Sequence, residues 1–140
     1  MEIVSSAQLL EALSKGERYF ENAKLDGEDF SEKSFKDCVF RDCAFIRCNF
    51  IGASFRRADL RGCYLAYSSF INADMRYCKL DGAVLHRANF ENASCEGASF
   101  KSALITQNYM RYAKDADLTE VINVHRNPKS KKPFNKDDRS

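Results

Sequence analysis

The sequence lacks the segments that would anchor it in a membrane or export it. The N-terminus, MEIVSSAQLLEALSKG, has no basic leader followed by an apolar run, and nowhere do eighteen consecutive apolar residues occur. The chain also has little of what catalysis uses: it has two histidines, His86 and His125, and no glycine-rich phosphate loop. We therefore expect a soluble, cytoplasmic protein with no membrane partner. In that compartment the six cysteines should be reduced thiols rather than disulfides.

The charges of the chain nearly balance, but they are unevenly spread. Lys and Arg number 22 and Asp and Glu 20 among 140 residues, which argues against general binding of polyanions or polycations. Residues 1–34 carry four basic and eight acidic side chains, whereas residues 35–90 carry nine basic and five acidic ones. The length is that of one domain, and the middle of this domain is basic.

Every fifth position from Phe20 to Met110 is non-polar, and we call these the centre positions. They are Phe20, Leu25, Phe30, Phe35, Phe40, Phe45, Phe50, Phe55, Leu60, Leu65, Phe70, Met75, Leu80, Leu85, Phe90, Cys95, Phe100, Ile105 and Met110. Two residues before the centre, all fourteen positions from Cys38 to Ala103 hold Cys, Ser or Ala. A strand would send alternate centres to opposite faces and a helix would rotate successive centres by about 140°, so neither buries them all.

A coil that turns a right angle every five residues points every centre at one axis. Four such sides make a square turn of twenty residues, and turns stacked at roughly 4.8 Å can pair through their backbones. Each corner then needs a residue that tolerates a positive φ. Gly or Asn stands two residues after the centre at eight positions, which hold five of the six glycines. The period therefore predicts an all-β solenoid.

The repeats resemble the A(D/N)LXX signature of pentapeptide repeat proteins. The segments that carry the resemblance are ADL at 58–60, ADM at 73–75, ANF at 88–90 and GASF at 52–55 and 97–100. The resemblance spans about residues 18–113. It implies the fold of that family, a right-handed quadrilateral parallel β-helix, here with about five coils.

The two ends of the chain depart from the repeat. The stretch SSAQLLEALSK has a serine cap, apolar residues at helical spacing and Gly16 as a stop, which predicts a short helix over the first coil. After Ala113 the register breaks, and we expect a turn or short helix over the last coil. The expected segments are an N-terminal capping helix (1–17), the β-helix (18–113), a C-terminal cap (114–124) and a basic tail (125–140) that we expect to be disordered.

We expect neither a metal site nor an enzyme. Cys38, Cys43 and Cys48 are spaced C-x₄-C-x₄-C, unlike the C-x-x-C pairs of zinc sites, and each belongs to a different side of one turn. We interpret them as small packing residues, with no metal and no cofactor. Cys43 and Cys63 lie one turn apart, within range of a disulfide, but in a cytoplasm the reduced state is expected. Because the inward positions are apolar, the interior offers no place for catalytic residues.

Long basic and aromatic side chains occupy corners where glycine would cost less. With their neighbours they form a candidate partner-binding belt: Arg47, Arg56, Arg57, Tyr67, Arg76, Tyr77 and Arg87. The alternative is that these side chains only stack on one another and solvate the wall. A second candidate surface, for a partner or for self-association, is apolar and outward: Ile46, Ile51, Tyr64, Ile71, Val84, Leu104, Tyr109 and Tyr112.

The sequence leaves several functions open. The leading hypothesis is a non-catalytic module or scaffold that presents its walls to an unidentified protein partner. The resemblance implies a second, since some pentapeptide repeat proteins mimic DNA, bind DNA gyrase and protect against fluoroquinolones, but mimicry needs an acidic surface and the middle of this chain is basic. The third, weak nucleic-acid binding by the belt, is disfavoured by the interleaved acidic residues. A homodimer also remains open.

Overall fold

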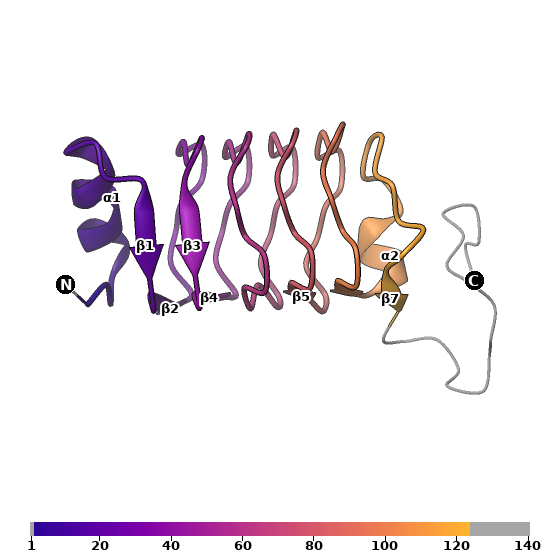
Figure 1. Ribbon diagram of the computed structural model, residues 1–140, viewed down its shortest axis with the longest axis horizontal. Helices are drawn as coiled ribbons and strands as arrows, with labels where there is room; N and C mark the ends of the chain where they lie inside the picture. Colours follow the sequence, from indigo (N-terminus) through magenta and orange to yellow (C-terminus); the bar gives the residue numbers. More distant parts are fainter. Residues whose placement is uncertain (1, 124–140) are drawn as a thin grey trace.

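The computed structural model of this protein describes residues 2–123 and shows a solenoid of stacked coils (Figure 1). Helix α1 covers one end of the stack, and β7 lies at the other. The helices are α1 (Ser6–Ser14) and α2 (Gln107–Met110), and the strands are β1 (Tyr19–Glu21), β2 (Lys24–Asp26), β3 (Val39–Arg41), β4 (Ala44–Ile46), β5 (Val84–Leu85), β6 (Leu104–Ile105) and β7 (Ile122–Asn123). The predicted β-solenoid is therefore confirmed.

The coils pair in parallel with a register of twenty residues. Tyr19 pairs with Val39 between β1 and β3, and isolated bridges keep the same offset as far as Ser94 and Lys114. Four sides of five residues make each turn, so the solenoid has four walls, which we number in chain order. Wall 1 contains the centres from Phe20 to Phe100, wall 2 those from Leu25 to Ile105, wall 3 those from Phe30 to Met110 and wall 4 those from Phe35 to Cys95.

Every corner of the coil has a residue with positive φ. The residue two places after the centre lies in this region at all seventeen corners from Asn22 to Ser102. The corner is closed by a backbone hydrogen bond, as where the Ala58 N–H donates to the Phe55 carbonyl at 2.9 Å. A positive φ in the third residue is typical of a type II turn, in which Gly or Asn is preferred. The corner prediction is confirmed, although arginine and tyrosine occupy several of these strained positions.

At several corners an Asn or Asp before the centre fixes the start of the turn. Asn49 Oδ1 accepts a hydrogen bond from the Ile51 N–H at 2.9 Å, and Asp74 Oδ1 accepts one from the Arg76 N–H at 3.1 Å. Asn and Asp favour such Asx turns because their short side chains reach the backbone two residues further on. This contact gives a physical reason for the D/N position of the repeat.

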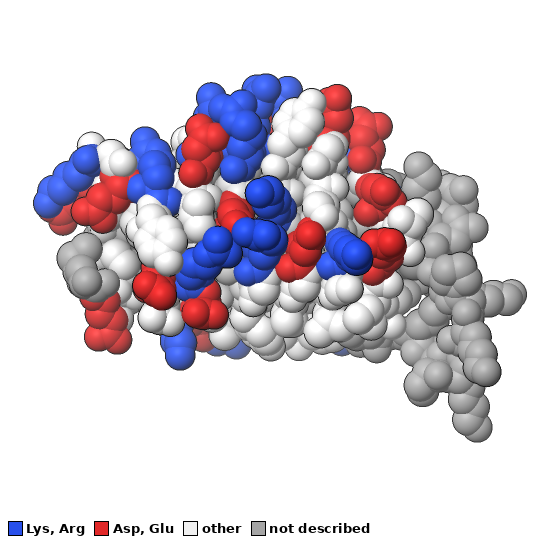
Figure 2. All heavy atoms as spheres, in the orientation of Figure 1, with Lys and Arg blue, Asp and Glu red and all other residues white. Residues whose placement is uncertain are grey.

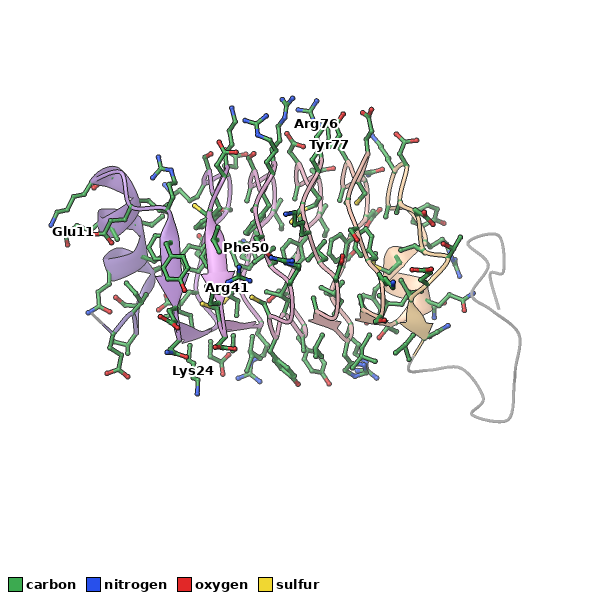
Figure 3. The ribbon with its side chains drawn as sticks, viewed as in Figure 1. Glu11, Lys24, Arg41, Phe50, Arg76 and Tyr77 are labelled. Atoms are coloured by element: carbon green, nitrogen blue, oxygen red, sulfur yellow. The ribbon has the colours of Figure 1, made fainter. Side chains whose placement is uncertain are left out.

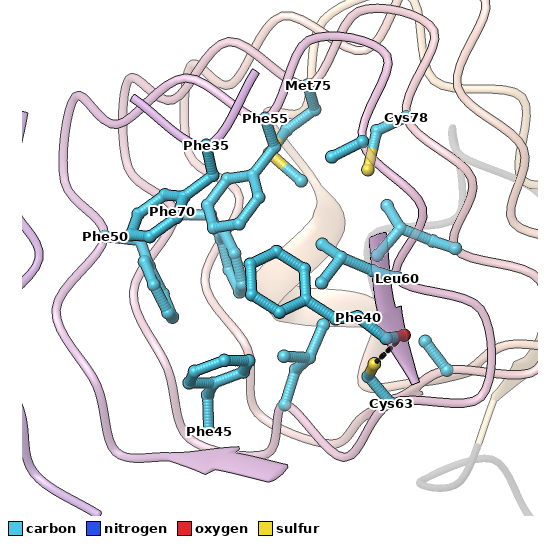
Figure 4. Close-up of a cluster of buried hydrophobic side chains, with 14 of the residues drawn as sticks. Phe35, Phe40, Phe45, Phe50, Phe55, Leu60, Cys63, Phe70, Met75 and Cys78 are labelled. Carbon is cyan, nitrogen blue, oxygen red and sulfur yellow. Dashed lines mark hydrogen bonds between the residues drawn. The ribbon is translucent and has the colours of Figure 1, made fainter. Parts of the chain in front are cut away.

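The centre positions form one continuous aromatic and aliphatic core (Figure 4). All nineteen centres are buried, as are the fourteen small residues that precede them. Phe50 stacks on Phe30 and Phe70 with ring centroids 5.3 and 5.1 Å apart, and it meets Phe45 and Phe55 edge to face. Offset stacks and edge-to-face contacts are the geometries that aromatic rings prefer. The rings therefore connect each coil to the next along the whole axis.

The six cysteines belong to this core and are free and buried. The Cys63 thiol lies 3.4 Å from the Phe40 carbonyl oxygen, to which it donates (Figure 4). Burial raises the pKa of Cys38 and Cys48 to about 11 and that of Cys63 and Cys95 to about 12. A thiol whose pKa is raised is protonated at neutral pH, so these cysteines pack as small apolar groups.

Helix α1 covers the N-terminal coil. The Ser5 hydroxyl accepts a hydrogen bond from the Gln8 N–H at 3.2 Å, which satisfies a free donor of the first turn. Leu9 and Ala12 are buried in the core cluster, and Gly16 follows the helix with a φ of 89°.

After Ala113 the described residues, up to Asn123, form turns at Asp115 and at Thr119–Glu120 and the short strand β7. The helix α2 lies earlier, within the last coil, and β7 pairs with β6 through Leu104 and Ile122. This pairing has a register of eighteen residues, because the last coil is two residues shorter than the others. Leu118 is buried beneath it. The expected tail, residues 125–140, lies outside the described residues.

We predict that Gly97→Ala destabilises the protein more than Gly82→Ala. The two glycines have φ values of 70° and 68°, so alanine costs about 1–2 kcal/mol of backbone strain at either. At Gly82 an added Cβ meets nothing within 4 Å, whereas at Gly97 it lies 2.6 Å from Cε1 of Tyr77. Displacing this ring should cost roughly 1 kcal/mol more. Urea unfolding measures the difference, and it should vanish in a Tyr77→Ala background; equal midpoints for the two single variants would contradict the contact.

We also predict that the folded protein has no fast-reacting thiol. Disulfide exchange needs a thiolate, and burial raises the pKa of Cys38 and Cys48 to about 11. Titration with Ellman's reagent at mildly alkaline pH should detect no thiol within minutes in native protein and six in concentrated guanidinium chloride. The variant Lys101→Cys, at an exposed position, provides the positive control with one fast thiol. Rapid labelling of the native wild type would show that a coil opens.

Candidate protein-binding surfaces

The described residues offer no enclosed chemical site. Within residues 2–123 no group of three His, Cys, Asp or Glu side chains could hold a metal ion. His86 Nδ1 lies 3.3 Å from Thr106 Oγ1, and this hydroxyl accepts the Arg87 N–H at 2.9 Å, so the contact supports the backbone of wall 2. Neither helix in this part of the chain has the length and apolar character that a membrane crossing requires. The candidate residues of the belt and of the apolar surface lie on the outer walls and corners.

The residues of the predicted belt do not form one surface. Arg47, Tyr67 and Arg87 lie on the corner that follows wall 2. The other four lie half a turn away, on wall 4 and the corner after it: Arg56, Arg57, Arg76 and Tyr77. Figure 3 shows Arg76 and Tyr77 at the upper edge of the solenoid and Lys24 of β2 at the lower edge. The belt is therefore two separate groups.

Most arginines of the wall 4 group are neutralised by carboxylates. Arg57 Nε lies 2.9 Å from Asp37 Oδ1, and Arg76 forms two hydrogen bonds of 2.8 Å with Asp74. The hydrogen bonds from Arg76 hold the pKa of Asp74 below its ordinary value. Figure 2 shows this upper edge as a mixture of basic and acidic side chains. The edge is therefore less cationic than its arginines alone indicate.

Wall 1 has a similar network around a buried carboxylate. Asp59 is 7% exposed and accepts hydrogen bonds of 2.9 and 2.7 Å from Arg61, and Arg41 lies 3.5 Å away. Burial alone would raise the pKa of Asp59, but the hydrogen bonds from Arg61 and the two positive charges outweigh it and lower this pKa. These cations are structural partners of Asp59.

The corner after wall 2 forms a ladder of stacked side chains. The guanidinium of Arg87 lies over the Tyr67 ring, 6.0 Å from its centroid, and the Tyr67 ring meets His86 edge to face at 5.4 Å. Arg47 Nε lies 3.0 Å from Asp26 Oδ1. Tyr67 and Arg87 therefore stack on one another, as the alternative from the sequence expects, and this contact does not decide whether they also bind a partner. Tyr67 nevertheless remains 47% exposed, so the ladder still presents aromatic surface.

An apolar column lies on wall 2, three residues before this ladder in each coil. Tyr64, Val84, Leu104 and Ile122 are successive partners in the parallel pairing. Tyr64 is 43% exposed and Ile122 is 51% exposed. Ile46 completes the apolar area, because it ends β4 immediately before the Arg47 corner. The structure therefore joins two features that the sequence analysis treated separately, and it adds Ile122, which the shortened last coil brings into the column.

The remaining apolar candidates lie on wall 3. Ile51 is 37% exposed, and Ile71 follows it one turn later. Tyr109 and Tyr112, at the end of this wall, line a hollow of about 310 Å³ together with Asn89, Glu91 and Asn108. The eight apolar candidates thus divide between two walls: those on wall 2 share a coil side with Arg47 and Arg87, and on wall 3 the Arg111 guanidinium lies 5.9 Å from the centroid of the Tyr112 ring.

Several solved structures are similar to this chain. A pentapeptide repeat protein from Nostoc PCC 7120, alr5209, is 25% identical, with 88% of this chain and 98% of that chain covered and a TM-score of 0.47. HetL, involved in heterocyst differentiation regulation in Nostoc sp. strain PCC 7120, is 22% identical, with 75% and 46% covered and a TM-score of 0.51. QnrB1, a plasmid-mediated fluoroquinolone resistance protein, is 17% identical, with 76% and 51% covered and a TM-score of 0.41. No curated protein matches the chain.

Family models give the assignment. Two models, both described as pentapeptide repeats, match residues 16–79 with nine copies and residues 68–107 with eight copies. Together they cover most of the coils, and HetL shares the fold. This chain belongs to the pentapeptide repeat proteins.

Proposed function

We propose that this protein is a non-catalytic protein-binding module and that wall 2, with the corner that follows it, is its recognition surface. The observation that carries the proposal is the adjacency of the apolar column and the arginine and tyrosine ladder. Tyrosine and arginine are enriched where protein partners bind tightly, especially around an apolar centre. Tyr64 and Ile122 are exposed and Val84 and Leu104 are half-buried between them, and contiguous apolar side chains at a surface favour contact with a partner.

The electrostatics support a protein partner over a nucleic acid. Arg57, Arg61 and Arg76 each have a carboxylate within 3 Å, so binding a phosphate would require that ion pair to open. Affinity for nucleic acid depends on cations that are available to phosphates. The charges also oppose mimicry of DNA, since residues 35–90 carry nine basic and five acidic side chains and mimicry needs an acidic surface. The gyrase alternative therefore gains no support from this surface.

We predict that the triple variant Tyr64→Thr, Val84→Thr and Leu104→Thr loses its partner while it remains folded. Threonine keeps the β propensity of these outward positions but removes apolar contact area. In a pull-down from the cells that make the protein, retention of the bound protein should fall at least about tenfold, as expected when several contact residues are truncated. Circular dichroism checks the fold.

The matched control is the variant Ile51→Thr and Ile71→Thr, which removes apolar side chains from wall 3. It should retain the partner at the wild-type level. The proposal for wall 2 is wrong if the control variant releases the partner and the wall 2 variant does not, or if neither the wild type nor the control captures any protein.

A further inference from the structure

Wall 2 presents a strip with the dimensions of one α-helix. Six rungs follow one another in its parallel pairing: Lys24, Ala44, Tyr64, Val84, Leu104 and Ile122. At about 4.8 Å between rungs the strip is roughly 24 Å long, and the three outward-facing residues of each side make it about 10 Å wide. Beyond this width the chain turns a corner. A single helix is about 10–12 Å across, and about sixteen residues span 24 Å.

The same dimensions argue against a second copy of this chain. Two flat walls placed face to face would cover about 240 Å² on each partner, or roughly 500 Å² in total, whereas specific stable interfaces bury about 1,200 Å² or more. The corners fall away on both sides, so a second solenoid could not extend the contact. A helix is convex and can contact both the strip and the ladder beside it.

The spacing of the rungs also suits a helix that lies along the solenoid axis. Helical turns are 5.4 Å apart and the rungs are about 4.8 Å apart. Each helical turn is therefore offset by about a further 0.6 Å from the rung that it faces. Over the three turns between positions i and i+11 the offset is about 1.8 Å, less than half of the spacing between rungs. Apolar side chains of the helix at positions i, i+4, i+7 and i+11 could therefore each meet one rung of the apolar column.

The charges beside the strip indicate that one side of the bound helix should be acidic. Arg47 and Arg87 lie along one edge, and Lys24 lies at one end. Among the outward side chains of this strip, the described part of the chain has one carboxylate, Asp26, which forms an ion pair with Arg47. Arg87 lies over the Tyr67 ring rather than against a carboxylate. An acidic side chain could hydrogen-bond to this guanidinium while the ring remains beneath it.

We propose that wall 2 binds an amphipathic α-helix of another protein, about sixteen residues long. Its apolar stripe lies on Tyr64, Val84 and Leu104, and an acidic flank faces Arg87. This proposal rests on the proposed function and specifies the partner of that same surface.

A designed peptide tests the proposal directly. The probe is a capped, fluorescein-labelled eighteen-residue helix with leucine at i, i+4, i+7 and i+11, glutamate along one flank and alanine elsewhere. One control peptide carries lysine in place of glutamate, and another has the same composition in scrambled order. Fluorescence anisotropy with the full chain should show saturable binding of the acidic peptide at least about tenfold tighter than of either control, weakening as salt rises.

Protein variants then locate the binding. The variant with Tyr64→Thr, Val84→Thr and Leu104→Thr should weaken binding of the acidic peptide at least about tenfold, and Arg87→Gln about threefold or more, because each removes one part of the predicted contact. The wall 3 variant with Ile51→Thr and Ile71→Thr should bind as the wild type does. Equal binding of the three peptides, or loss of binding in the wall 3 variant alone, would overturn the proposal.

The outcomes separate this proposal from the proposed function. If a cellular partner is lost with the wall 2 variant but the acidic peptide does not bind, wall 2 recognises a surface of another shape, and only the helix proposal fails. If the wall 2 variant retains the cellular partner as well as the wild type does, the proposed function is wrong. Light scattering tests a third outcome. If the wild type is a dimer and the wall 2 variant is a monomer, a second copy of this chain occupies wall 2 and the helix proposal is wrong.

Discussion

The stacking of each centre residue on the centre twenty residues later is the interaction on which the rest of the structure depends. Phe30, Phe50, Phe70 and Phe90 form one such stack, with centroids 4.8–5.3 Å apart. This distance is close to the spacing of paired strands, so ring stacking and backbone pairing fix the same register. Because each coil contacts only its neighbours, the stability of the whole is close to a sum over adjacent coils.

This interior has a direct consequence for function. The rings and the small residues beside them fill the axis, and Ser68, the polar residue among the small ones, uses its hydroxyl to donate to the Phe45 carbonyl at 2.8 Å. Chemistry is therefore confined to the walls and corners. At the corners a long side chain costs backbone strain, because φ is positive there. Arg57 offsets this cost with an ion pair and Arg87 with its contact to Tyr67, so the strain alone does not identify a binding site.

The period of five predicted the inward residues and the corners because both are set by the backbone path. The partners of outward side chains were not predictable in the same way. Arg57 reaches Asp37 one turn back, whereas Arg76 folds onto Asp74 in its own turn, and the sequence contains nothing that chooses between the two. The column on wall 2 gains Ile122 only because the last coil is two residues short. The period of five could not predict that the last coil is two residues shorter than the others.

The side chains of wall 2 would influence both association between copies of this chain and the choice of a partner. An exposed apolar strip on a β-structure invites lateral association, and charged residues at its margin oppose this because like charges meet when two copies approach. Arg87 and Lys24 stand at the margins of this strip and would act in this way. A partner with carboxylates along one side reverses the sign of the same interaction, since these cations then attract it. The residues that would keep copies of this chain apart are thus also the ones suited to select an acidic partner, which would give arginine at such a strained corner a reason that glycine could not supply.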